Sequence, residues 1–152
     1  MRYTQIFLGL RHIPILGWLT TKLMALFGPD IPLEVQIGHA LRLAHRGQGV
    51  VVAPRTRIGD RVTIFHQVTI GAAEVTQAQS VSSFGGVVID DDAILCAGCK
   101  VLAGKDPLTV GAGTIVGANA VLLKSTGEFE IWAGMPARRI GLREHRGVSA
   151  GL

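Results

Sequence analysis

Two histidines, His45 and His66, are the residues of this chain best suited to acid–base chemistry. Neutral imidazole removes a proton from a hydroxyl group near neutral pH, and a positioned base contributes roughly 10²–10⁴-fold to a reaction rate. A carboxylate that orients the ring improves such a base, and Asp30 is the candidate for this role. An ordinary exposed histidine would give the same local sequence, so the significance of the pair depends on the elements that carry it.

An aliphatic residue recurs at every sixth position over much of the chain, as at Ile58, Ile64 and Ile70. A period of six fits neither an amphipathic helix nor an alternating strand. It fits a triangular coil in which each side is a short strand plus a turn, with the aliphatic side chain directed to the axis. One coil cannot bury its aliphatic residues alone, so the pattern predicts a stack of coils.

The period assigns three faces, one for each side of the triangle. Face one carries Ile37, Ile58, Ile89 and Val110; face two carries Leu43, Ile64, Leu95 and Val116; face three carries Val52, Ile70, Val101 and Leu122. This register predicts a column formed by His45, His66, Ala97 and Ala118, each two positions after a face-two aliphatic residue. Members of the column would lie about 4.8 Å apart. The alanines would leave a shallow groove for an extended cofactor arm, with the histidines at its reactive end.

At 152 residues the chain is expected to form one domain. We assign a short helical segment to residues 1–29, the β-helix to residues 30–124 and a C-terminal extension to residues 125–152. The largest interruption of the period is a polar inserted loop at residues 72–87. Loops of this length on a regular scaffold are frequently functional.

The apolar N-terminal stretch raises the question of a membrane segment. It is interrupted by Arg11, His12 and Pro14, and no small-residue cleavage site follows it cleanly. The stretch is therefore a poor transmembrane span and a poor signal peptide. We expect an amphipathic helix or helix pair there, no membrane contact, and a cytoplasmic protein.

The composition favours a fold of thin aliphatic layers with many tight turns. The chain is 48% hydrophobic but only 5% aromatic, so Val, Ile, Leu and Ala must build the core. Its 20 glycines show no collagen-like period and are expected at turns. The net charge of +4 permits anionic partners, but no helix-turn-helix, finger or aromatic-basic pattern indicates nucleic-acid binding.

The two cysteines, Cys96 and Cys99, fit the repeat without any chemical role. They occupy positions that glycine and a small residue occupy in other repeats. A zinc site would need two more ligands at suitable spacing, and the sequence offers no such pair. We therefore predict no metal and no nucleophilic cysteine, and nothing indicates an oxidising compartment.

Several motifs together resemble the serine O-acetyltransferase branch of the hexapeptide-repeat acyltransferases. The branch resemblance is carried by Asp30-Ile31, Ile37-Gly38, Leu43-Ala44-His45 and Val68-Thr69-Ile70-Gly71. The run I-W-A-G-M-P-A-R-R-I at residues 131–140 resembles the closing motif of the family. The similarity extends from about Asp30 to Gly141, which is most of the chain.

The resemblance implies a left-handed parallel β-helix that forms a homotrimer, with active sites between adjacent subunits. His45 would match the catalytic histidine of the family, and Asp30 its carboxylate partner. Acetyl-CoA would be the acyl donor and would lie along the wall of the helix, with Lys124 and the basic C-terminal segment near its phosphates. The residues implied in cofactor binding are Gly71, Ala97, Gly117, Ala118, Lys124 and Arg138.

The chain departs from the family pattern where the acceptor binds. Ala44 stands where the family has an acidic residue directly before the catalytic histidine, and Gly85-Gly86 stand where it has an Arg-His pair. The resemblance therefore leaves the acceptor open among a serine-like amino acid, a sugar and a biosynthetic intermediate. His66, Gly85 and Gly86 are the residues assigned to the altered acceptor site.

The sequence favours an acetyl-CoA-dependent O-acetyltransferase with His45 as general base, and two alternatives stay open. An N-acetyltransferase acting on an amino sugar or amine would need less assistance from a base. A non-catalytic β-helix that binds or scaffolds would explain the lost acceptor residues. A γ-carbonic anhydrase would need three histidine ligands; His45 and His66 could supply two, and no third occurs in the later coils.

Overall fold

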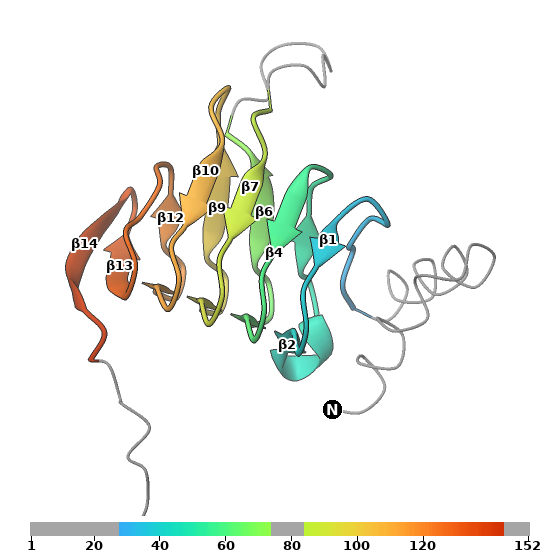
Figure 1. Ribbon diagram of the computed structural model, residues 1–152, viewed down its shortest axis with the longest axis horizontal. Coiled ribbons are helices and arrows are strands. Elements are labelled where there is room, and N and C mark those ends of the chain that lie inside the picture. Colours follow the sequence, from blue (N-terminus) through green and yellow to red (C-terminus); the bar gives the residue numbers. More distant parts are fainter. Residues whose placement is uncertain (1–27, 74–83, 145–152) are drawn as a thin grey trace, which may run out of the picture.

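The computed structural model describes residues 28–73 and 84–144, which fold as the left-handed parallel β-helix that the sequence predicts (Figure 1). Short strands form three sheets that wrap around one axis. Within the described part of the chain, the one helical element is the short 3₁₀ helix η1 (Ala44–Gly47). The helical segment predicted for residues 1–29 lies outside the described residues except at its end. No helix in the described ranges has the length and hydropathy of a membrane span.

The three sheets correspond to the three predicted faces. Face one contains β1 (Gln36–Ile37), β4 (Thr56–Ile58), β7 (Val87–Ile89) and β10 (Leu108–Val110), in that order. Face two contains β2 (Arg42–Leu43), β5 (Thr63–Ile64), β8 (Ile94–Leu95), β11 (Ile115–Val116), β13 (Glu130–Gly134) and β14 (Ala137–Leu142). Face three contains β3 (Val51–Val52), β6 (Thr69–Ala72), β9 (Lys100–Ala103) and β12 (Val121–Leu122). All strand pairs are parallel except the β13–β14 hairpin.

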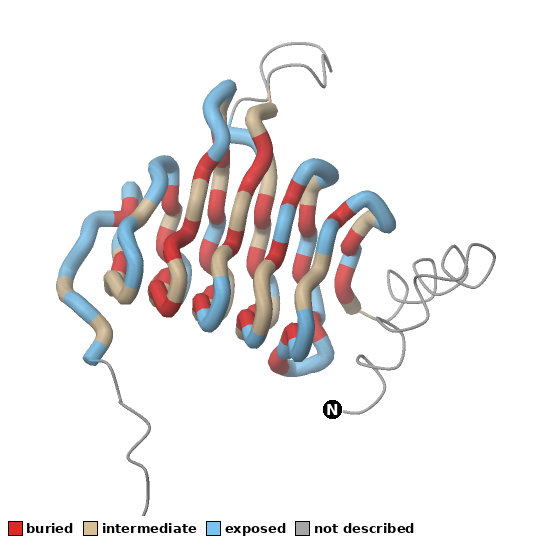
Figure 2. The backbone as a smooth tube through the Cα atoms, viewed as in Figure 1, coloured by how far each residue is buried: buried red, intermediate tan, exposed pale blue. Residues whose placement is uncertain are grey.

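The predicted register is confirmed on every face. On face one, Ile58 pairs with both Ile37 and Ile89, and Ile89 pairs with Val110. All of the aliphatic residues that define the faces are buried except Ile37, which is partly buried against the same core. Burying one such side chain contributes roughly 1.5–3 kcal/mol, so the stacked columns are the main source of stability. Figure 2 shows buried positions alternating with intermediate or exposed ones along the coils.

The column of face two continues beyond the hexapeptide repeats. Trp132 of β13 pairs with Val116 and is only 6% exposed, so its ring covers the C-terminal end of the aliphatic core. Its indole Nε1 donates a hydrogen bond to the Glu130 carboxylate at 2.8 Å, which satisfies the polar atom of a buried aromatic. This hydrogen bond also lowers the pKa of Glu130 below its ordinary value.

The coil turns through left-handed backbone at fixed positions. We name the turn between faces one and two corner A, that between faces two and three corner B, and that between faces three and one corner C. At corners A and B, the third residue after the aliphatic residue has positive φ: Ala40, Arg61, Asp92 and Gly113; and Arg46, Gln67, Gly98 and Asn119. Most of these residues are not glycine, so the coil packing must hold them in a conformation that L-residues rarely adopt.

Gly38 and Gly59 directly follow aliphatic residues and lie in the turns of corner A, as expected for glycines of the repeat. Gly38 and Gly59 do not have positive φ. A Cβ at Gly38 would collide with Oδ1 of Asp60, and a Cβ at Gly59 would collide with Oδ1 of Asp91. Glycine is therefore needed at these positions because successive coils approach closely, and not because the turn requires a positive φ.

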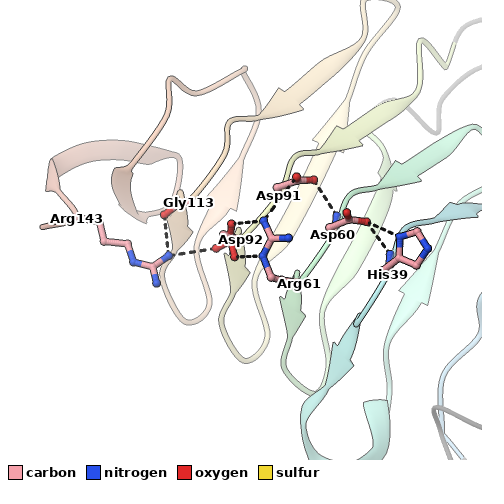
Figure 3. A network of polar contacts seen from close by, with 7 residues as sticks. All are labelled: His39, Asp60, Arg61, Asp91, Asp92, Gly113 and Arg143. Carbon is pink, nitrogen blue, oxygen red and sulfur yellow. Dashed lines mark hydrogen bonds and ion pairs between the residues drawn. The ribbon is translucent and has the colours of Figure 1, made fainter. Parts of the chain in front are cut away.

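A series of polar contacts links successive coils at corner A; we call it the corner A ladder (Figure 3). The backbone N–H of His39 donates to Oδ1 of Asp60 at 2.7 Å, and that of Asp60 donates to Oδ1 of Asp91 at 2.8 Å. The hydrogen bond from His39 is the main reason that the pKa of Asp60 lies below its ordinary value. Each aspartate thus caps a backbone group of the preceding coil.

The ladder continues through charged side chains. The guanidinium of Arg61 donates two hydrogen bonds to the carboxylate of Asp92, at 2.8 and 2.7 Å, and these bonds lower the pKa of Asp92. Arg143 then donates to the carbonyl oxygens of Asp92 and Gly113, both at 3.1 Å. The end of the described chain is therefore tied back to the middle coils.

Candidate active site

The predicted column of His45, His66, Ala97 and Ala118 lies at corner B. The face-two register pairs the aliphatic residue before each member with its counterpart in the next coil, so the four residues follow one another along the helix axis. The backbone N–H of Asn119 donates to the carbonyl oxygen of Ala97 at 2.9 Å, which fixes the coil spacing within the column. Ala97 is half-buried and Ala118 is exposed. The column therefore has two imidazoles at one end and two methyl groups at the other.

In the coil that contains His45, corner B is longer than in the other coils. In this coil η1 occupies the turn, and His45 and Arg46 are both in left-handed backbone, with φ of 51° and 61°. Gly47 is buried and also has positive φ, at 69°. The extra turn leaves the side chain of His45 exposed while Ala44 beside it is only 6% exposed. The methyl group of Ala44 thus occupies a buried position where the resemblance implies a carboxylate.

The rings of His45 and His66 are in direct contact. Their centroids lie 4.9 Å apart, with an interplanar angle of 86°. The ring of Phe65 lies 6.5 Å from that of His45 and packs at a tilt. His66 is half-buried, and its Nδ1 is the one buried side-chain nitrogen or oxygen of the described residues that has no hydrogen-bond partner.

Phe65 was not predicted to belong to this cluster. Phe65 follows the face-two aliphatic residue directly, at the position that Gly117 holds in a later coil. An aromatic ring at a position otherwise held by small residues is the signal that could have identified it.

Asp30 lies on the coil beside η1. Its backbone N–H donates to the carbonyl oxygen of Val50 at 2.8 Å, and its own carbonyl oxygen accepts from the N–H of Val52 at 2.9 Å. The chain just before it passes so close to η1 that a Cβ at Gly28 would lie 3.0 Å from the carbonyl oxygen of Arg46. The Asp30 side chain is exposed, and within the described residues no hydrogen bond joins it to His45. Its orienting role stays a prediction.

The residues predicted to bind the cofactor extend from corner B across face three. Gly117 is half-buried beside Ala118, and its N–H donates to the carbonyl oxygen of Trp132 at 2.7 Å. Gly71 lies on β6 opposite Leu102. Lys124 is exposed, with its Nζ 5.4 Å from the centroid of the Trp132 ring.

Arg138, the last of the predicted cofactor residues, is exposed on β14. Its Nη1 donates to the carbonyl oxygen of Ala137 at 3.1 Å. Lys124 and Arg138 thus place two exposed cations on the last turn and the hairpin of the β-helix.

Gly85 and Gly86 lie at corner C, away from the histidines of the same subunit. The N–H of Gly85 donates to the carbonyl oxygen of Gly104 at 2.9 Å. Both glycines line a cavity of about 300 Å³ together with Arg55 and Arg57. These arginines belong to the coil preceding Gly86 and were not among the residues predicted for the site.

Neither glycine leaves room for a side chain. A Cβ at Gly86 would lie 2.7 Å from the carbonyl oxygen of Arg55, and φ at Gly86 is +97°. A Cβ at Gly85 would collide with the carbonyl oxygen of Lys105. The backbone of corner C therefore has no space for the Arg-His pair that the family pattern has at these two positions.

The cysteines occupy structural positions. Cys99 is fully buried, and burial raises the pKa of its thiol to about 12. Burial also raises the pKa of Cys96. Across residues 28–73 and 84–144, no group of three or more histidine, cysteine or acidic side chains is arranged to hold a metal ion.

Comparisons with known proteins agree with the resemblance read from the motifs. No family model matches the chain. The chain is 32% identical over 131 residues to serine acetyltransferase 4 of Arabidopsis thaliana, covering 86% of this chain and 34% of that protein. It is 34% identical over 129 residues to the serine acetyltransferase of Staphylococcus xylosus, covering 80% of this chain and 56% of that protein.

A solved structure gives the same result. The fold matches that of serine acetyltransferase from Brucella abortus strain S19 in complex with coenzyme A, with a TM-score of 0.72 and 28% identity. The match covers 86% of this chain and 48% of that chain. This chain spans from about a third to just over half the length of these proteins. The predicted likeness to serine O-acetyltransferases, in sequence and in fold, is thereby confirmed.

Proposed function

We propose that this serine acetyltransferase-like hexapeptide-repeat chain transfers an acetyl group from acetyl-CoA to the hydroxyl group of a small acceptor, with His45 as general base. The observation that carries the proposal is the column at corner B, in which the exposed imidazole of His45 contacts that of His66 and two alanines follow along the axis. The similarity to serine acetyltransferases, one of them solved with coenzyme A, covers 80% and 86% of this chain in the two comparisons.

The proposed reaction is a direct transfer. The acceptor hydroxyl donates a hydrogen bond to the imidazole of His45, which removes its proton as the oxygen attacks the thioester carbon. The carbonyl electron pair moves onto oxygen to give a tetrahedral oxyanion. Collapse of this intermediate breaks the carbon–sulfur bond, and the imidazolium returns the proton to the leaving thiolate. Asp30 would orient the ring and stabilise its charged form.

The donor would extend from corner B toward the cationic end of the β-helix. Gly117, Ala97 and Ala118 leave space for the pantetheine arm because none has a side chain larger than a methyl group, and Gly71 does the same on face three. Lys124 and Arg138 are exposed cations suited to the phosphates of the nucleotide end. No metal takes part in the proposed reaction.

The working unit in this proposal is a homotrimer with active sites between adjacent subunits. Within one subunit the histidines lie at corner B and the Gly85-Gly86 cavity lies at corner C. Corner C of a neighbouring subunit could complete the site that corner B begins.

The acceptor in this proposal is a small molecule with a free hydroxyl group. L-serine is the first candidate because the matched relatives are serine acetyltransferases. Ala44, Gly85 and Gly86 nevertheless lack the charged groups that the family pattern uses to hold an amino acid. A sugar or a biosynthetic intermediate with a free hydroxyl group is an alternative acceptor of the same chemical class.

The test measures release of the coenzyme A thiol from acetyl-CoA with L-serine, L-homoserine, amino sugars and hexoses as acceptors. Acceptor-dependent release should fall at least a hundredfold in His45→Ala, within the range expected for loss of a general base of roughly 10²–10⁴-fold. His39→Ala removes an exposed histidine at corner A and should leave the rate unchanged.

Two results would contradict the proposal. A rate unaffected by His45→Ala would exclude this base and favour an amine acceptor, which needs less assistance. Binding of acetyl-CoA without transfer to any acceptor would favour a β-helix that binds but does not catalyse.

A further inference from the structure

The tetrahedral oxyanion of the proposed reaction needs a hydrogen-bond donor, and the backbone near the histidines offers few. The N–H of Gln67 donates to the carbonyl oxygen of Gln48 at 2.8 Å. The N–H of Gly98 donates to the carbonyl oxygen of His66 at 3.0 Å. These amides on the two sides of His66 are therefore committed to holding the coils together. A side-chain donor beside His45 would fill the need.

The two ring nitrogens of His66 differ in their surroundings. Nδ1 is buried without a hydrogen-bond partner, whereas Nε2 is not among the buried unpaired atoms of the described residues. Neutral imidazole has one N–H donor and one acceptor nitrogen, and its surroundings select the tautomer. An N–H group buried without an acceptor is rare in folded proteins. The proton of the neutral ring is therefore best placed on Nε2, which makes Nε2 the donor.

The position of His66 relative to His45 suits this role. The two rings lie in T-shaped contact, with 4.9 Å between centroids, at successive levels of the column. Seen from His45, Ala97 and Ala118 lie beyond His66 in the column, and the acetyl donor would extend along them. A thioester carbonyl that is attacked beside His45 would therefore lie next to His66. The carbonyl oxygen would then lie within reach of the level that His66 occupies.

We propose that Nε2–H of His66 donates a hydrogen bond to the oxyanion formed during acetyl transfer, which makes His66 a second catalytic residue. The inference rests on the proposed function. His45 takes the hydroxyl proton and later returns it to the sulfur, while His66 keeps its own proton throughout. Donation to an oxyanion strengthens as negative charge develops, so the contact stabilises the transition state more than the bound substrates.

Three variants at position 66 test the role. His66→Phe keeps an aromatic ring against His45 but removes the donor, and kcat should fall roughly 10²–10³-fold. KM for acetyl-CoA and for the acceptor identified with the panel should change less than about threefold, because the bond forms in the transition state. His66→Gln supplies a side-chain N–H group and should recover at least about tenfold of the kcat lost in His66→Phe. His66→Ala should match His66→Phe.

Gln67→Asn provides the matched control. It shortens the exposed side chain next to His66 without altering either histidine, and asparagine tolerates the positive φ of 59° at this position. Its kcat should stay within about threefold of the wild type. Thermal unfolding of every variant separates a loss of donor from a loss of fold.

The possible outcomes discriminate between the two proposals. If His45→Ala abolishes transfer but the His66 variants retain full kcat, the oxyanion role is wrong and the proposed function stands. A rise in acceptor KM at unchanged kcat would assign His66 to acceptor binding instead, and equal losses in the Gln and Phe variants would exclude hydrogen-bond donation. No transfer by the wild type to any acceptor would overturn the proposed function, and this inference with it.

Discussion

His45 and His66 meet in a T-shaped ring contact with 4.9 Å between their centroids, although they belong to successive coils of the β-helix. The contact exists because the coils stack in register, so the residues two positions after each face-two aliphatic residue fall into one column. The relative position of His45 and His66 therefore depends on coil stacking more than on any local motif. Substitutions that leave the coils stacked should be able to change kcat and the melting temperature independently of each other.

Asp30→Asn should lower kcat by roughly tenfold or more while leaving the melting temperature unchanged, because an amide cannot stabilise a charged imidazole as a carboxylate does. The backbone hydrogen bonds of Asp30 with Val50 and Val52 do not involve the altered atoms. Steady-state kinetics and thermal unfolding check the two expectations. Glu128→Gln removes another exposed carboxylate, just before β13, and serves as the control. Equal activity of both variants with the wild type would remove Asp30 from the mechanism.

Gly86→Ala should destabilise the fold by roughly 1–3 kcal/mol, because φ at Gly86 is +97° and the added Cβ would lie 2.7 Å from the carbonyl oxygen of Arg55. Gly104→Ala is the matched control: nothing lies within 4 Å of its added Cβ, and φ is not positive there. That variant should be as stable as the wild type or up to about 1 kcal/mol more stable. Denaturant unfolding measures both, and equal stabilities would contradict the crowding at corner C.

Asp92→Asn should lower the melting temperature near neutral pH, and the difference from the wild type should shrink in acid. The hydrogen bonds from Arg61 hold the pKa of Asp92 below its ordinary value of 3.8. A carboxyl group with a lowered pKa in the folded state contributes its stability above the unfolded pKa and loses it as pH falls through the folded one. Thermal unfolding between pH 7 and pH 2 gives the comparison.

The control for the corner A ladder is Asp106→Asn, which alters an exposed carboxylate at corner C. High salt should also reduce the effect of Asp92→Asn, because the Arg61–Asp92 pair lies at the surface. A difference between Asp92→Asn and the wild type that grows in acid would contradict the assigned ion pair.

Cys99 should resist alkylation in the folded protein at pH 8 and react fully in denaturant. Its thiol is buried and has a pKa of about 12, so little thiolate exists to react. Mass spectrometry after treatment with iodoacetamide measures the labelling. Cys99→Ala should retain acetyl transfer, and its loss in a variant of unchanged melting temperature would show that the thiol has a chemical role.

The sequence alone was sufficient to predict the faces and the column of corner B. A strict period places every aliphatic residue once the coil length is known, and the structure pairs Ile58 with Ile37 and Ile89 as the period requires. The position of His45 above His66 followed from the same count. Periodic burial is a local property of the sequence, so it can be read without knowledge of the fold.

Other features depend on contacts that no local pattern specifies. The aspartates of the corner A ladder bind backbone groups one coil away, and their partners emerge only after the coils are stacked. Trp132 continues the face-two column although the hexapeptide period has ended before it. Gly38 and Gly59 lie in turns, as the repeat suggested, but glycine is required there because of crowding between coils, which the sequence does not show.

Corner A has a constant length in every coil, with four residues between strands at 38–41, 59–62, 90–93 and 111–114. The interruptions of the repeat fall at corners B and C, beside the histidines and the Gly85-Gly86 cavity. The corner A ladder thus joins the coils at the turn whose length does not vary. Exchanging segments at corner C should therefore leave the stacking of His45 on His66 intact, and it would redirect acceptor choice if corner C binds the acceptor as proposed.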